Sequence, residues 1–221
     1  MPEKLNLELP PSLQPGQPAP EFTLPAIHRE GTVSLADYRG RTPLLLALFR
    51  GIYCPFCRRG IAQLGMTAEK LKALGVETLA VVASQVDRAR LYFRYRPTRL
   101  SLAADPELAT FRAFQVPKPE ATPQLMESLR TTQSDAGGEL PERVSILDAV
   151  NALDEKDRFE HTPTDTEEME KQFPQLLGQF LLDRAGIIRW VNIETAREGL
   201  AGLGNHPTDE EFLAAARALK T

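Results

Sequence analysis

Two cysteines are the residues of this chain best suited to chemistry. Cys54 and Cys57 lie three positions apart in the segment CPFC, and they are the only cysteines among 221 residues. Two thiols at this spacing could bind a metal, form a structural disulfide, stay inert in a core or carry out redox exchange. Redox exchange needs a thiolate that attacks and a second thiol close enough to resolve the mixed disulfide.

The metal and structural alternatives are the weaker ones. A tetrahedral zinc site needs four ligands, and the only histidines, His28, His161 and His206, are far apart with no paired spacing. A CxxC segment without a second pair is a poor metal signal. A disulfide across two residues closes too small a loop to stabilise a chain of this size much. We therefore expect no metal, no cofactor and no structural role for a disulfide.

The segments around CPFC predict a reactive position for Cys54. Residues 42–49 form an almost unbroken apolar run of strand length, and a helical pattern extends from Pro55 to about Leu74. Proline is favoured at the first position of a helix, which makes Cys54 the N-cap. Its sulfur would then face unpaired backbone N–H groups and the positive end of the helix dipole, which lower a thiol pKa. We predict that Cys54 attacks and that Cys57, shielded behind it, resolves.

Three nearby arginines are candidates for stabilising a Cys54 thiolate. Arg58 and Arg59 belong to the first turn of the predicted helix, and Arg50 lies at the end of the preceding strand. Their positive charges favour the ionised form of a neighbouring thiol.

Charge and hydropathy limit which classes of binding partner and which cellular location we expect. The chain has 26 basic and 30 acidic residues, a net charge of −4, which argues against nucleic acid and anionic membrane as partners. No apolar run approaches the roughly 20 residues that span a bilayer. The N-terminus lacks a basic segment followed by an apolar one, as a secretory signal would have. We expect a cytoplasmic protein.

The order of predicted elements indicates an α/β sandwich around a mixed sheet. Strands are expected at 21–25, 32–35, 42–49, 76–83, 100–103, 179–183 and 187–192, and helices at 55–74, 84–95, 105–114 and 208–219. The caps expected for three of these helices are Ser84 with Asp87, Asp105 before Pro106, and Thr208 with Glu211.

The segment between these elements differs in composition. Residues 118–175 contain 14 acidic and 6 basic side chains, a net charge of −8, whereas the remainder is +4. We interpret residues 117–175 as an insertion of roughly 60 residues on the surface, with one or two short helices, one of them beginning at Thr164. It is expected to shape access to Cys54 or to bind a basic partner.

Several blocks of the sequence resemble one known family. GQPAPEFTLP (16–25), SLADYRGRTPLLLALFRG (34–51), CPFC, SLAADPELATFRAFQV (101–116) and FLLDRAGIIRWV (180–191) are similar to the alkyl hydroperoxide reductase/thiol-specific antioxidant group of the thioredoxin-like superfamily and its peroxiredoxin-like relatives. The resemblance implies one thioredoxin-like domain over 1–221, a three-layer sandwich with an N-terminal extension. Its core would be 16–116 and 176–221, with the insertion before the last hairpin.

The chain departs from the family at positions that choose the substrate. Peroxiredoxins place a proline and a threonine seven and three residues before the attacking cysteine, where this chain has Ala47 and Gly51. Their late arginine would fall near Leu177, and the nearest match to the cis-proline of thioredoxins is Gly178. Leu177 and Gly178 are therefore our candidates for a loop that contacts substrate.

The intact dithiol and the resemblance together favour a thiol–disulfide oxidoreductase. The nearest alternative is a peroxidase that reduces hydroperoxides through a Cys54 sulfenate, and an alternative of another class is a non-catalytic interaction scaffold. The expected partners are a disulfide or hydroperoxide substrate and a protein or low-molecular-weight thiol as reductant. The oligomeric state is left open.

Overall fold

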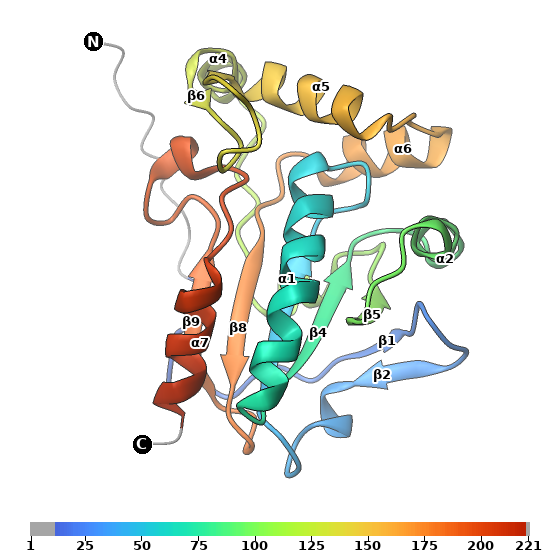
Figure 1. Ribbon diagram of the computed structural model, residues 1–221, viewed down its shortest axis with the longest axis vertical. Helices are drawn as coiled ribbons and strands as arrows, with labels where there is room; N and C mark the ends of the chain where they lie inside the picture. Colours follow the sequence, from blue (N-terminus) through green and yellow to red (C-terminus); the bar gives the residue numbers. More distant parts are fainter. Residues whose placement is uncertain (1–11, 220–221) are drawn as a thin grey trace.

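A mixed five-stranded sheet forms the centre of the protein in this computed structural model, which describes residues 12–219 (Figure 1). The strands lie in the order β5 (Ser101–Ala104), β4 (Glu77–Val82), β3 (Leu44–Phe49), β8 (Gly178–Leu182) and β9 (Ile188–Ile193). Strands β3, β4 and β5 are parallel, whereas β8 is antiparallel to both β3 and β9. The predicted mixed sheet is thus confirmed, with β3 at its centre.

Each face of the sheet is covered by its own layer. One face packs against α1 (Pro55–Ala73), α2 (Val86–Tyr95) and α7 (Asp209–Ala218). The other packs against α3 (Ala109–Ala113), η1 (Leu35–Asp37) and the hairpin of β1 (Thr23–Pro25) and β2 (Thr32–Ser34). Successive strand side chains point to opposite faces, so Leu45 packs under α1 and Leu46 packs on the far side. This two-sided burial explains why β3 is apolar throughout.

The N-terminal segment covers one edge of the sheet. Gly16 N–H donates to Ile188 O at 2.8 Å, and Ile188 N–H donates to Gln17 O at 2.9 Å, so residues 16–17 lie along β9. The start of β9 is therefore not free to pair with another chain. The first eleven residues of the predicted extension lie outside the described part of the chain.

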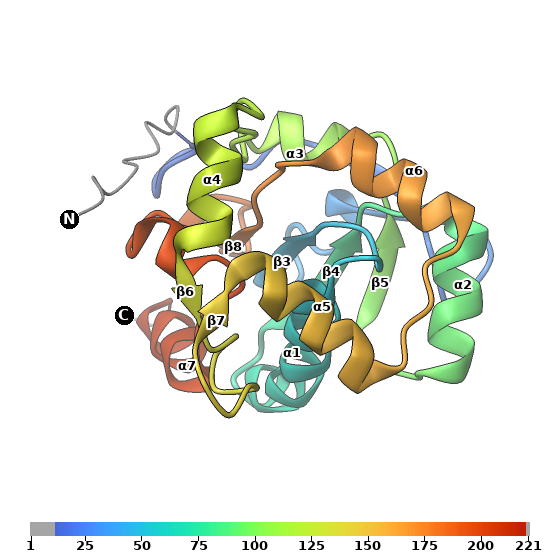
Figure 2. The same ribbon diagram turned by 90° about the horizontal axis from the view of Figure 1, so that it is seen from above.

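Residues 117–175 form a helical layer over one end of the sheet. They contain α4 (Pro123–Thr131), β6 (Gln133–Ser134), β7 (Val144–Ser145), α5 (Ile146–Asp157) and α6 (Pro163–Gln172). The three helices lie in an arc above the ends of β3 and β4 (Figure 2). Leu129, Ile146 and Leu153 are buried in the same apolar cluster as Cys54. The interpretation as a surface excursion was therefore wrong, because the segment contributes to the core.

Ion pairs join this acidic layer to the rest of the chain. Asp154 and Asp157 of α5 bind Arg58 of α1, and Asp165 of α6 binds Arg88 of α2. Opposite charges are thus used within the molecule, at contacts between the layer and the core.

The N-cap residues of three helices can be compared with those predicted from the sequence. Thr208 and Glu211 form the predicted capping box of α7. The N-cap of α6 is Thr162, not Thr164. Ser84 does not cap α2, whose N-cap is Gln85; its hydroxyl is buried and donates to Glu168 instead.

The start of α3 differs from the sequence prediction. The helix expected from Asp105 starts later, at Ala109, although the Asp105 carboxylate still accepts a hydrogen bond from Ala109 N–H at 2.9 Å.

Among residues 12–219, no helix is both long and apolar enough to cross a bilayer.

Candidate active site around Cys54

Cys54 lies at the N-cap of α1, directly after the turn that leaves the central strand β3. Its sulfur accepts a hydrogen bond from the Cys57 backbone N–H at 3.3 Å, and Pro55 occupies the first helical position. Both features match the sequence prediction. Cys54 is only 5% exposed, and Cys57 is completely buried behind it.

The pKa values of the two thiols are shifted in opposite directions. Burial alone raises the pKa of Cys54, but the hydrogen bond from the Cys57 thiol and the charge and hydrogen bond of Arg50 outweigh it and lower the pKa to about 6. The pKa of Cys57 is raised well above its ordinary value by burial, by its hydrogen bond to Cys54 and by the charge of Cys54. At neutral pH the proton therefore stays on Cys57, and Cys54 is the thiolate.

A buried carboxylate holds Arg50 beside this thiolate. Arg50 Nη1 and Nη2 donate to Glu194 Oε2 and Oε1 at 2.7 and 3.1 Å, and Nη1 also donates to Gln175 O at 2.8 Å. The Glu194 carboxylate in turn accepts from the backbone N–H groups of Leu177 and Gly204. Such a two-point contact with satisfied oxygens fixes the orientation of a guanidinium.

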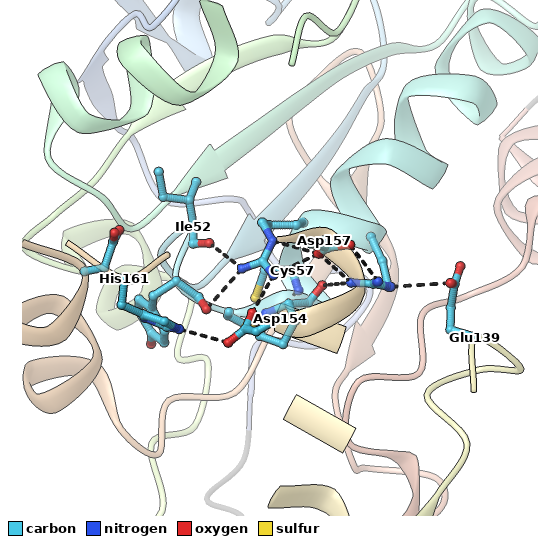
Figure 3. Close-up of polar contacts among 12 residues, drawn as sticks. Ile52, Cys57, Glu139, Asp154, Asp157 and His161 are labelled. Atoms are coloured by element: carbon cyan, nitrogen blue, oxygen red, sulfur yellow. Dashed lines mark hydrogen bonds and ion pairs between the residues drawn. The ribbon is translucent and has the colours of Figure 1, made fainter. Parts of the chain in front are cut away.

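Arg58 and Arg59, predicted to stabilise the thiolate, form ion pairs with carboxylates of α5. Figure 3 shows a row of charged contacts that begins at His161 and runs through Asp154, Arg58, Asp157 and Arg59 to Glu139. The carboxylates of α5 thus neutralise both arginines. Of the three candidate arginines, only Arg50 is among the main groups that lower the pKa of Cys54.

Arg58 has a second set of contacts near the motif. Its Nη1 donates to the carbonyls of Ile52 and Tyr53 at 3.0 and 3.2 Å. It therefore supports the turn before Cys54 through these two backbone carbonyls.

An apolar cavity of about 200 Å³ opens onto Cys54. The inserted layer supplies most of its wall, through Pro119, Leu125, Leu129, Ile146, Leu147, Val150, His161, Met169, Phe173, Pro174 and Gln175. Arg50 and Tyr53 line it from the side of the motif. A substrate that reaches Cys54 through this cavity must therefore contact the inserted layer.

The predicted substrate loop is displaced along the chain. Leu177 is 1% exposed, and Gly178 is paired within the sheet, where a Cβ would lie 2.8 Å from Val116 Cγ2. Neither residue lines the cavity; residues 173–176, just before them, do. A cis peptide bond lies at Phe173–Pro174, before the position that was aligned with the cis-proline of thioredoxins.

Sequence reasoning missed several groups of this site. Glu194 immediately follows the last strand, and nothing local linked it to Arg50, 144 positions earlier. His161 was not assigned to the site, yet it lies on the cavity wall, bound to Asp154 at 2.8 Å. Within residues 12–219, no cluster of three or more His, Cys, Asp or Glu side chains is arranged to hold a metal ion.

The family model described as AhpC/TSA family matches residues 15–191. The chain belongs to the AhpC/TSA family. No curated protein matches this AhpC/TSA chain. Family membership agrees with a thiol-based redox function for a chain whose two cysteines lie at the start of α1.

Solved structures similar to this AhpC/TSA protein have the thioredoxin-like fold. Reduced 2-Cys peroxiredoxin of Plasmodium vivax is 14% identical with a TM-score of 0.59, over 93% of this chain and 81% of the other. Peroxidoxin BcpB of Mycobacterium tuberculosis is 11% identical with a TM-score of 0.57, over 94% and 97%. A thiol:disulfide interchange protein DsbE of Chlorobium tepidum is 20% identical with a TM-score of 0.51, over 94% and 97%. At these identities the likeness shows the fold.

Proposed function

We propose that this protein is a dithiol oxidoreductase in which Cys54 attacks and Cys57 resolves. The observation that carries the proposal is the opposite shift of the two pKa values within one helical turn. With a pKa of about 6, the Cys54 thiolate outnumbers the thiol roughly tenfold at pH 7. A non-catalytic scaffold has no need of an ionised, buried sulfur beside a fixed guanidinium.

The reaction with a disulfide proceeds in two exchanges. The Cys54 thiolate attacks one sulfur of the substrate, a mixed disulfide forms, and the first substrate thiolate leaves. Cys57 then attacks the Cys54 sulfur, which closes the Cys54–Cys57 disulfide and releases the second substrate thiolate. A thiol reductant returns both cysteines to the reduced state by the reverse exchanges.

The first exchange prepares Cys57 for the second. While Cys54 is a thiolate, its hydrogen bond and its negative charge add to burial in keeping the proton on Cys57. In the mixed disulfide the Cys54 sulfur is neutral, so both of these effects disappear and the pKa of Cys57 falls. The resolving thiolate therefore forms only after attack.

A peroxidase is the second candidate, and the cavity favours it. A space of about 200 Å³ with an almost wholly apolar wall admits a small organic molecule, whereas a folded protein could not bring a disulfide to a sulfur that is 5% exposed. Attack on ROOH would give the Cys54 sulfenic acid and RO⁻, which takes up a proton and leaves as the alcohol. Cys57 would then condense with the sulfenic acid, giving the same disulfide and water.

The decisive experiment compares substrates under rapid mixing. Reduced protein is mixed with glutathione disulfide, hydrogen peroxide or cumene hydroperoxide, and loss of thiols is followed before any reductant is added. Fast reaction with the disulfide alone supports the first candidate, and fast reaction with cumene hydroperoxide supports the second. Because the chain has two thiols, mass analysis should find a loss of two hydrogens, as expected for one intramolecular Cys54–Cys57 disulfide.

Two variants identify the acting thiol. Cys54→Ser should abolish reaction with every substrate, whereas Cys57→Ser should still attack and then stop at the mixed disulfide or sulfenic acid. Full activity of Cys54→Ser would exclude both candidates, and equal inertness of the wild-type protein toward all three oxidants would favour the scaffold.

A further inference from the structure

The turn that joins β3 to Cys54 is closed by a backbone hydrogen bond from Cys54 N–H to Gly51 O at 3.0 Å. Gly51, Ile52 and Tyr53 separate Arg50 from Cys54, so their conformation sets where the guanidinium lies relative to the sulfur. All three residues are buried. Their backbone N–H groups therefore need partners inside the protein.

Gln172, at the end of α6, binds this turn directly. Its Oε1 accepts from Gly51 N–H at 2.9 Å and from the Tyr53 hydroxyl at 3.1 Å, and its Nε2 donates to Ala83 O. Gln172 is fully buried. One side chain of the inserted layer thus ties the turn to the end of β4.

Glu168, one helical turn earlier on α6, holds the middle of the same turn through Ser84. Ser84 Oγ accepts from Ile52 N–H at 3.1 Å and donates to Glu168 Oε2 at 2.8 Å. Glu168 Oε1 accepts from Gln85 N–H at 2.7 Å. A Cβ on residue 51 would lie 2.8 Å from Glu168 Oε2, so glycine lets α6 approach this closely.

We propose that Gln172 and Glu168 are positioning residues of the redox site, which hold the Gly51–Tyr53 turn so that Cys54 faces Arg50. Neither side chain touches the sulfur; each acts through the backbone or through Ser84. The inserted layer is then part of the catalytic machinery as well as the wall of the cavity. The inference rests on Cys54 as the nucleophile.

The test follows alkylation of Cys54 by limiting iodoacetamide across pH, which reports the thiolate without any substrate. The charged and titratable groups around the sulfur are Cys57 from α1, Arg50 from the end of β3, Tyr53 from the turn and Glu194 from the end of β9, with His161 on the cavity wall. Gln172→Leu, which removes the acceptor for Gly51 N–H, should move the midpoint upward by about one pH unit. Glu168→Gln, which keeps the shape of the side chain, should move it in the same direction by less.

The matched control loosens α6 elsewhere. Lys171→Gln removes the exposed ion pair with Glu107 but changes no contact of the Gln172 side chain or the turn. Urea denaturation gives the stability of each variant, and the alkylation midpoint of Lys171→Gln should stay at the wild-type value. An unchanged midpoint in Glu168→Gln and in Tyr53→Phe, which loses only one hydroxyl contact, would overturn the proposal even if Gln172→Leu failed to fold.

Arg50→Gln separates failure of this inference from failure of the proposed function. If Arg50→Gln raises the midpoint and the α6 variants do not, α6 has no positioning role and the dithiol proposal stands. If Arg50→Gln also leaves the midpoint unchanged, the electrostatic basis of the proposed function is lost.

Discussion

Arg50 and Glu194 form a buried two-point ion pair beside the sulfur of Cys54, with distances of 2.7 and 3.1 Å from the guanidinium nitrogens to the carboxylate oxygens. The pair brings together the ends of β3 and β9, which are separated by β8 in the sheet. It places a fixed positive charge at the thiolate, while the negative partner lies behind the guanidinium. The charge of Arg50 can therefore stabilise Cys54 without the arginine being free to turn toward solvent.

Removal of this charge should make Cys54 less acidic. Because an adjacent opposite charge commonly lowers a pKa by roughly 1–3 units, Arg50→Gln should raise the pKa of Cys54 by an amount in that range. The ultraviolet absorbance of the thiolate, titrated with pH, measures it. Arg99→Gln is the control, since that side chain is 83% exposed and pairs only with Glu69; an equal shift in both variants would contradict a local effect.

Removal of the Arg58 side chain should weaken the packing of the inserted layer on the core and lower the free energy of unfolding. Arg58→Ala leaves Asp154 and Asp157 short of a partner, frees two buried carbonyls and loses the stacking of the guanidinium 4.0 Å above the Phe159 ring. Breaking a buried ion pair typically costs roughly 3–5 kcal/mol, and Arg59 still neutralises Asp157, so we expect a loss near the lower end. Urea denaturation measures this free energy of unfolding.

An exposed ion pair provides the comparison for Arg58. Arg217 and Glu210 are both more than half exposed, so Arg217→Ala should change the free energy of unfolding by no more than about 1 kcal/mol. Equal losses in Arg58→Ala and Arg217→Ala would mean that the contacts of Arg58 do not hold the layer.

Acid should destabilise the protein through the same layer. Burial opposes ionisation of Asp157 and Asp165, but hydrogen bonds from Arg59 and Arg58 and from Arg88 outweigh it and lower both pKa values below the ordinary 3.8. A lowered pKa contributes stability above the unfolded value, and this stability is lost as the pH falls through the folded value. The urea concentration at which half of the protein is unfolded should therefore decrease as the pH is lowered below about 4. In Arg88→Gln this drop should be smaller; an identical pH dependence would contradict the assignment.

The cavity should govern which reagents reach Cys54. Leu147→Trp adds volume on the wall of a cavity of about 200 Å³, and it should slow alkylation by N-phenylmaleimide far more than alkylation by iodoacetamide. Exposed Leu91 on α2 lies outside the cavity wall, so Leu91→Trp is the control. If Leu147→Trp slowed both reagents equally, Cys54 would be reached by another route.

Elements with a strong local pattern could be predicted from the sequence. The apolar run of β3, the proline after Cys54 and the capping box of α7 each depend on residues within a few positions, and all three lie where they were expected. Local patterns also suffice for the order of strands and helices in a mixed sheet.

The inserted layer could not be predicted because its burial depends on distant partners. Its acidic residues have the composition of a solvated surface, and the contacts of Asp157 with Arg58 and of Asp165 with Arg88 show that some of them face the core instead. The same limit applies to Arg58 and Arg59. Their positions in the first turn of the helix predict that they stabilise the Cys54 thiolate, and the sequence does not show that carboxylates of α5 bind them instead. Glu194 and Gln172 were missed for this reason too.

The long separation between Arg50 and Glu194 has a consequence for the newly made chain. During synthesis Cys54 leaves the ribosome well before Glu194, which is 144 positions after Arg50, and before Gln172, which is 121 positions after Gly51. Until both arrive, the cysteine lacks the fixed arginine and behaves as an ordinary thiol, mostly protonated at neutral pH. The low pKa of Cys54 is thus a property of the completed fold, which requires the last strand of the sheet.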